Sequence, residues 1–94
     1  MSYSLRISQE AEKEWNKLDA TIKNQFKKKL EERIEKPRVE KNRLSGMRDC
    51  YKIKLRSAGY RLVYRVYDKE LEILIVAVGK RERNGVYKAA AKRL

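Results

Sequence analysis

The stretch YKIKLRSAGYRLVY, residues 51–64, constrains the fold more than any other part of the chain. Apolar and polar residues alternate through it, and a period of two is typical of β-strands that bury one face. We therefore predict strands over residues 51–56 and 60–67, joined by a tight turn. The sequence that follows predicts a third strand over residues 71–79. This strand is apolar on both faces, so we expect it to be buried on both sides.

The basic side chains of this predicted hairpin share one face of the sheet, because side chains alternate along a strand. Lys52, Lys54 and Arg56 lie on that face of the first strand, and Arg61 and Arg65 lie on it in the second. We expect Arg56 to pair with Arg61, through either a two-residue turn or a four-residue loop. A three-residue loop would bury Arg61 without a partner, which is costly for a guanidinium, so the sequence predicts a shared basic face.

The N-terminal half predicts a short strand and two helices. Residues 3–7 alternate between apolar and polar side chains, as a half-buried strand does. Ser8 and Asp19 each precede apolar residues at helical spacing, so both are predicted to cap helices at their N-termini. The second helix is expected to end before Pro37, because a proline disfavours helical geometry in the residue before it.

These elements, with a short helix rich in Ala and Lys over residues 86–94, predict an α+β fold. We expect an N-terminal strand, a two-helix hairpin packed on one face of a mostly antiparallel four-stranded sheet, and the short C-terminal helix. The other face of the sheet is expected to be uncovered. A chain of 94 residues has the size of one domain, so residues 1–94 are predicted to form a single one.

The net charge of +12 is concentrated in the middle of the chain. Residues 36–65 hold ten Lys and Arg against two acidic residues, whereas the first 35 residues are nearly balanced. A surface that serves only solubility would spread its charge. The basic block therefore predicts a polyanionic partner, with nucleic acid as the first choice and an acidic protein as the second.

Residue types disfavour several classes of function. The chain has no histidine and a single cysteine, Cys50, so it offers no internal disulfide, no imidazole acid or base and no Cys/His metal cluster. We therefore expect no metal, no cofactor and a reducing, cytoplasmic location. The longest apolar run, residues 73–79, is too short to span a membrane, and the N-terminus lacks the apolar core of a signal peptide.

A candidate groove forms where the third predicted strand returns beside the hairpin turn. Arg81 can then reach the groove that holds Lys52, Lys54 and Arg61, with Tyr87 just beyond it, but the sequence leaves open the side from which Arg81 leaves the strand. Guanidinium and ammonium groups suit a phosphate, and a tyrosine ring can stack on an RNA base. RNA binding alone would account for this set of residues.

The same groove is a candidate for RNA cleavage, because the 2′-hydroxyl of RNA is a built-in nucleophile. A site that positions this hydroxyl and stabilises developing negative charge supplies much of the catalysis. Without histidine, a lysine is the candidate base. Lys52 and Arg61 are expected to lower the pKa of Lys54, since neighbouring positive charges disfavour its protonated form. The residues alone leave binding and cleavage both open.

Two long stretches resemble a known family. The runs LSGMRDCYKIKLRSAGYRLVYRV and VGKRERNGVY, together with AEKEWNKL and PRVEKNRLSGM, are similar to the RelE/ParE superfamily of bacterial toxins, and within it to the mRNA-cleaving RelE family. A loose L.G…YR…Y pattern indicates only the superfamily. The full set Lys52, Lys54, Arg61, Arg81 and Tyr87 is more specific, and the resemblance covers nearly the whole chain.

The resemblance implies a microbial-ribonuclease-like fold and a ribosome-dependent endoribonuclease that cuts mRNA in the A site. The 2′-hydroxyl would attack and leave a 2′,3′-cyclic phosphate and a 5′-hydroxyl. By this similarity Lys54 is the base, helped by Lys52. Arg61 stabilises the transition state, Arg81 stabilises charge or protonates the leaving oxygen, and Tyr87 stacks on the nucleotide.

The family also implies partners. These are a RelB-type antitoxin whose acidic segment wraps the toxin and displaces the C-terminal helix, the ribosome with its 16S rRNA, and mRNA. The complex with the antitoxin is expected to repress its own operon. Further RNA contacts are predicted for Arg56, Arg65, Lys80, Arg83, Lys41, Arg43 and Arg48. The alternatives are a ParE-like toxin that poisons gyrase without cleaving RNA, and a non-catalytic RNA- or ribosome-binding protein.

Overall fold

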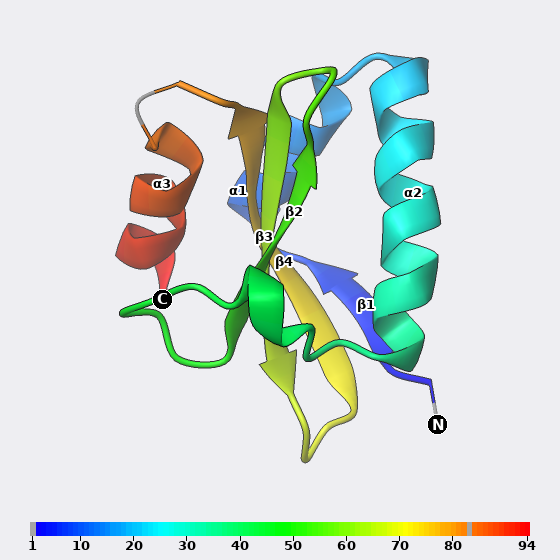
Figure 1. Ribbon diagram of the computed structural model, residues 1–94, viewed down its shortest axis with the longest axis vertical. Helices are drawn as coiled ribbons and strands as arrows, with labels where there is room; N and C mark the ends of the chain where they lie inside the picture. Colours follow the sequence, from blue (N-terminus) through cyan, green and yellow to red (C-terminus); the bar gives the residue numbers. More distant parts are fainter. Residues whose placement is uncertain (1, 83) are drawn as a thin grey trace.

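The computed structural model of the chain describes residues 2–82 and 84–94. In that part of the chain the elements follow in the order β1 (Ser4–Ile7), α1 (Gln9–Asn16), α2 (Ala20–Glu35), the 3-10 turn η1 (Glu40–Asn42), β2 (Cys50–Leu55), β3 (Tyr60–Tyr67), β4 (Glu72–Lys80) and α3 (Gly85–Arg93) (Figure 1). This order confirms the predicted α+β class. The predicted bounds of the strands and of the C-terminal helix differ from the observed ones by at most one residue.

The four strands form one mixed sheet in the order β1-β4-β3-β2. The central pair β3–β4 and the outer pair β2–β3 are antiparallel, and β1 runs parallel to β4. A β-bulge interrupts the β3–β4 register between Val63 and Tyr64. The prediction of a mostly antiparallel four-stranded sheet is therefore confirmed, with the buried strand β4 near its centre.

The hairpin register differs from the predicted one by two residues. Leu55 pairs with Tyr60 and Lys54 pairs with Arg61, so the expected pairing of Arg56 with Arg61 is wrong. The turn instead spans residues 56–59, where the amide of Gly59 donates to the carbonyl of Leu55 at 2.8 Å. Gly59 has φ +72°, which favours glycine at this position. Because the shift is even, every side chain stays on its predicted face.

Both predicted helix caps are present. The hydroxyl of Ser8 accepts from the amide of Ala11 at 3.2 Å, and the carboxylate of Asp19 accepts from the amide of Ile22 at 2.9 Å. Each bond satisfies one of the amides that a helix N-terminus leaves unpaired. Helix α2 ends at Glu35, two residues before Pro37, as predicted.

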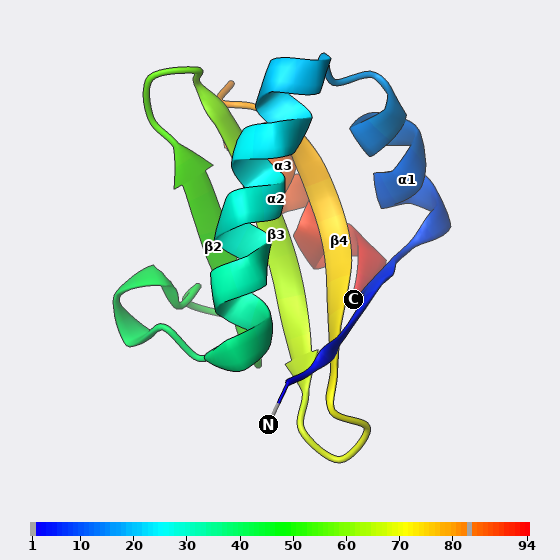
Figure 2. The same cartoon turned by 90° about the vertical axis from the view of Figure 1, so that its right-hand side faces the viewer.

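The main core lies between the sheet and the helices α1 and α2, which cover the same face (Figure 2). Phe26 of α2 is fully buried at its centre, with Trp15 of α1 6.1 Å away between ring centroids. The buried residues of this cluster are Ala11, Leu18, Ile22, Phe26, Leu30, Tyr51, Ile53, Leu55, Leu62, Tyr64, Val66, Ile73, Ile75 and Val78.

The second face of the sheet is partly covered by α3, so the expectation of an uncovered face is wrong. Val86 and Ala90 of α3 join a smaller buried cluster with residues of the sheet and of the 36–49 connector. Gly79 permits this close approach, since a Cβ there would lie 3.2 Å from Cγ2 of Val86. Figure 1 shows α3 and α2 on opposite sides of the sheet. The apolar signal of α3 was too weak to predict this contact from an Ala-rich sequence.

The hydroxyl of Tyr64 ties the connector to the core, because it donates to the carbonyl of Pro37 at 2.6 Å in a buried position. Burial raises the pKa of Tyr64 to about 12, so the hydroxyl stays protonated and remains a donor. We expect Tyr64→Phe to lower the free energy of unfolding by about 1–2 kcal/mol, since it leaves a buried carbonyl without its donor. Urea unfolding with an unchanged m-value would measure this loss.

Tyr60→Phe is the matched control, because the Tyr60 hydroxyl makes no hydrogen bond within the described residues. We expect this control to change the free energy of unfolding by less than about 0.5 kcal/mol. Equal losses in the two variants would show that the bond to Pro37 contributes nothing.

Candidate functional site

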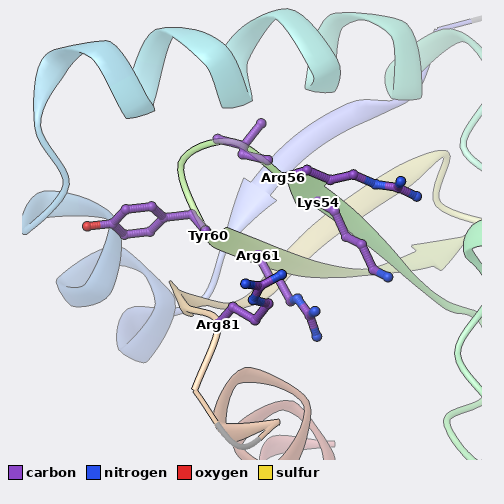
Figure 3. Close-up of a pocket in the computed structure, with 7 residues that line it drawn as sticks. Lys54, Arg56, Tyr60, Arg61 and Arg81 are labelled. Atoms are coloured by element: carbon purple, nitrogen blue, oxygen red, sulfur yellow. The ribbon is translucent and has the colours of Figure 1, made fainter.

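A hollow of about 340 Å³ opens where the β2–β3 turn meets the end of β4 (Figure 3). Four of its seven lining residues are cationic and none is acidic. The lining residues are Lys54, Leu55, Arg56, Gly59, Tyr60, Arg61 and Arg81. We call this hollow the basic groove. Its charge suits an anion that offers several oxygen acceptors, such as a phosphodiester.

The sheet register places Lys54 and Arg61 directly opposite each other. On its other side Arg61 pairs with Gly79, which has no side chain to fill the space beside the guanidinium. Cross-strand partners point to the same face of a sheet, so Lys54 and Arg61 enter the groove from neighbouring strands. The two-residue register shift thus brings these cations closer together than the sequence predicted.

Arg81 enters the groove from the end of β4. Its backbone amide donates to the carbonyl of Gly59 at 2.7 Å, which extends the sheet contact beyond the last strand pair. Figure 3 shows the side chains of Arg81 and Arg61 gathered on the same side of the turn. The structure places Arg81 beside Lys54 and Arg61 in the groove, on a side that the sequence left open, and its role remains a proposal.

Tyr87 lies beside the groove, in the first turn of α3. The guanidinium carbon of Arg61 sits 5.2 Å from the centroid of the Tyr87 ring, within the range of a cation–π contact. The Tyr87 hydroxyl is buried and has no hydrogen-bond partner within residues 2–82 and 84–94. The contact with Arg61 fixes one face of the ring and links the position of α3 to the groove.

The charges of the groove act on Lys54. Lys52 lies on the same face of β2, and its charge is the largest influence that lowers the pKa of Lys54. Partial burial and the charge of Arg61 lower that pKa further. The direction agrees with the sequence-based expectation. A lowered pKa raises the fraction of neutral amine at physiological pH, and the neutral amine is the form that can accept a proton.

Other predicted RNA-contacting residues lie around or away from the groove. Arg56 lines it, but its guanidinium extends away from Arg61 and Arg81 (Figure 3). Arg65 shares the face but pairs with Cys50, four residues along β3 from Arg61. Lys80 pairs with Tyr60, so it lies on the opposite face of the sheet from Arg61.

The connector residues form a separate basic surface. Arg43 and Arg48 line a second hollow with residues 44–47, and the Arg48 side chain is 90% exposed. Lys41 is exposed on η1. The structure places these three residues outside the basic groove. Arg83 lies outside the described residues.

Two glycines that shape the groove were not identified from the sequence as functional. Gly59 supplies the carbonyl that holds Arg81, and Gly79 leaves space beside Arg61 and under Val86. Gly79 stands at the end of the apolar run ILIVAVG, where it signals only the end of a strand. The close approach of Val86 that Gly79 permits could not be predicted at this position, because Val86 belongs to a helix that follows later in the chain.

The described residues hold no group of three or more His, Cys, Asp and Glu side chains arranged to bind a metal ion. Within the same residues, no helix combines the length and apolar composition that crossing a bilayer requires.

Comparison with known proteins gives a consistent result. Residues 5–85 match the family described as the ParE toxin of the type II toxin-antitoxin system parDE. The mRNA interferase toxin RelE of Escherichia coli K12 is 55% identical over 94 residues, which are 100% of this chain and 99% of that protein. A putative RelE-like toxin protein of Escherichia coli is 50% identical over the same shares.

Solved structures agree with this relationship. The R81A/R83A mutant of E. coli toxin RelE in the free state superposes with a TM-score of 0.92, at 53% identity and over 100% of this chain and 99% of that chain. The toxin in the intact E. coli RelBE toxin-antitoxin complex has a TM-score of 0.84 at 55% identity, over 87% of this chain and 100% of that chain. This chain therefore belongs to the RelE toxins of the ParE toxin family.

Proposed function

We propose that this chain is the toxin of a type II toxin–antitoxin system and that it cleaves mRNA in the ribosomal A site. Its E. coli relative is an mRNA interferase toxin. One observation carries the proposal to this chain. The fold gathers Lys54, Arg61 and Arg81 in one groove, with Tyr87 against Arg61. This arrangement supplies cations and a stacking ring for one nucleotide and its phosphate.

The proposed reaction uses the 2′-hydroxyl of the RNA as nucleophile. Neutral Lys54 takes the proton of this hydroxyl, and the 2′-oxygen forms a bond to the adjacent phosphorus. The bond from phosphorus to the 5′-oxygen breaks, and that oxygen receives a proton from Arg81 or from water. The products are a 2′,3′-cyclic phosphate and a 5′-hydroxyl.

The remaining groups stabilise the charge of the transition state or position the RNA. Arg61 and Arg81 donate hydrogen bonds to the phosphate oxygens, where negative charge grows in the transition state. Lys52 keeps the pKa of Lys54 low. The Tyr87 ring stacks on the base. The groove is lined with cations and therefore repels divalent metal ions, so we propose that the reaction needs neither metal nor cofactor.

We propose that the ribosome positions the mRNA strand in the groove. Among the described residues that line the groove, none belongs to an element that would bend free RNA into the in-line geometry that 2′-hydroxyl attack requires. The exposed Arg43 and Arg48 on the connector surface are proposed contacts to 16S rRNA. This function places the protein, as a single domain of residues 1–94, in the cytoplasm with the ribosomes.

A RelB-type antitoxin is the proposed partner, as in the E. coli RelBE complex. Two features support it. The basic groove attracts an acidic segment, and an apolar hollow between β1, α1 and α2 is lined in part by Leu5, Trp15 and Leu30. Leu5 is 46% exposed on the edge strand β1, where a partner strand or helix would bury it. We also propose that the complex represses its own operon.

Replacing both Arg61 and Arg81 by alanine is expected to lower ribosome-dependent mRNA cleavage by about 10³-fold or more, because two donors to the developing charge are lost. Mapping mRNA 5′ ends after brief induction would measure this loss. The double variant should still bind ribosomes and the antitoxin. Full growth inhibition by the variant would contradict the assigned site.

Lys80→Ala is the matched control, because it removes a nearby cation from the opposite face of the sheet. We expect it to cleave nearly as well as the unaltered protein. Induction of the unaltered protein also separates the alternatives. DNA damage with intact mRNA would identify a gyrase-directed toxin, and harmless overexpression would identify a plain RNA-binding protein.

Cleavage measured in single turnover is expected to rise with pH, as Lys54 loses its proton, and then to level off. Lys52→Met removes the largest influence that lowers the pKa of Lys54. That pKa then moves up toward the ordinary lysine value, so the rise should shift to higher pH and the rate at neutral pH should fall. Lys41→Met, on the exposed η1 turn, should leave the profile in place. A pH profile that Lys52→Met does not move would exclude Lys54 as the base.

A further inference from the structure

Helix α3 is fastened to α1 by an ion pair at its C-terminal end. The guanidinium of Arg93 donates to both carboxylate oxygens of Glu14, at 2.9 and 3.1 Å. Its Nε also lies 3.6 Å from a carboxylate oxygen of Glu10. The two ends of the pair are 79 positions apart in the sequence. The side chain of Arg93 is only 18% exposed and that of Glu14 30%, so water screens this pair less than it screens a surface pair.

The same two side chains satisfy backbone groups of β4. Strand β1 pairs with β4 only as far as Ile75. Just beyond, the carbonyl of Val76 accepts from Arg93 at 2.9 Å, and the amide of Val78 donates to Glu14 at 3.1 Å. Val76 is the extra residue at which the β3–β4 register is interrupted, and Val78 lies two residues further along β4. The ion pair therefore joins three elements, α1, β4 and α3, at one point.

Besides this pair, α3 is held by one small apolar cluster. The helix has nine residues, GVYKAAAKR, and its buried side chains are Val86 and Ala90. An isolated helix of this length is marginal in water, so its order depends on contacts with the rest of the protein. Val86 packs near its start, against Gly79. Arg93 supplies the polar contact at its other end.

The docking of α3 bears on the basic groove through Tyr87. Tyr87 belongs to the first turn of α3, and its ring lies 5.2 Å from the guanidinium carbon of Arg61. If α3 were released at its C-terminal end, we would expect the buried contacts of Ala90 to be lost first and the fixed orientation of Tyr87 next. We propose that Glu14 and Arg93 are positioning residues, which dock α3 and thereby hold the Tyr87 ring on Arg61 in the groove. The link to RNA cleavage rests on the proposed function.

The test compares Arg93→Gln with Lys92→Gln, which removes a neighbouring exposed cation from the same helix. Three quantities are measured on the purified chain: hydrogen exchange of the amides in residues 85–93, the NMR shifts of the Arg61 side chain, and cleavage on programmed ribosomes. The chemical shifts of the Arg61 side chain depend on the position of the Tyr87 ring. They therefore distinguish a displaced ring from a general loss of stability.

We expect Arg93→Gln to speed exchange in α3 by roughly tenfold or more, since hydrogen bonds to a charged partner are lost. The Arg61 signals should move toward those of a Tyr87→Ala variant, and cleavage should fall by roughly the same factor. Lys92→Gln should change none of the three quantities. Arg93→Lys keeps the charge with a single donor group and should restore part of each.

Unchanged exchange and unchanged Arg61 shifts in Arg93→Gln would overturn the docking role. Loosened exchange with full cleavage would overturn the positioning role. Should Arg93→Gln prove too unstable to study, the same comparison is made with Glu14→Gln, which keeps an amide oxygen for the Val78 amide. If the unaltered protein cleaves no mRNA on ribosomes, the proposed function fails, while the exchange and NMR data still decide whether the pair docks α3.

Discussion

The cross-strand pair of Lys54 and Arg61 is the constraint on which the rest of the site depends. Like charges placed directly opposite each other on a sheet repel, so this pairing persists only because other contacts fix the register. Leu55 and Leu62 bury the opposite face of the same two strands against α1 and α2. A slip by one residue would put the cations into that core and the leucines into water. Burial of the apolar face therefore fixes the register that keeps Lys54 and Arg61 opposite each other.

The fold and the shared face of the basic side chains follow largely from local sequence. Alternation places Lys52, Lys54 and Arg61 on one face, and the caps Ser8 and Asp19 mark where the helices begin. The register of the hairpin did not follow, because Ala-Gly does not select one turn type and the Leu55–Gly59 bond forms only in the folded turn. The contact of Glu14 with Arg93 did not follow either, since it joins residues 79 positions apart and depends on how α1, β4 and α3 pack.

The second face of the sheet shows why composition alone misleads. The Ala-rich C-terminal helix offers little apolar area, which is why the sequence predicted an uncovered face. Gly79 lets Val86 approach the sheet closely, and a small cluster then forms with Val63 and Val76. The same approach brings Tyr87 to Arg61. The groove is thus bordered by a short helix that follows the hairpin later in the chain.

Repulsion among the cations in and beside the groove also bears on what can bind there. Lys52 and Arg61 lie close enough to Lys54 to lower its affinity for a proton. A polyanion in the groove would offset this repulsion between positive charges. On the proposed function, RNA and an acidic antitoxin segment are attracted to the groove by the same positive charges, so they compete for it. Neutralisation of the toxin then needs no distortion of the sheet, because an acidic segment in the groove occupies the space that RNA would take.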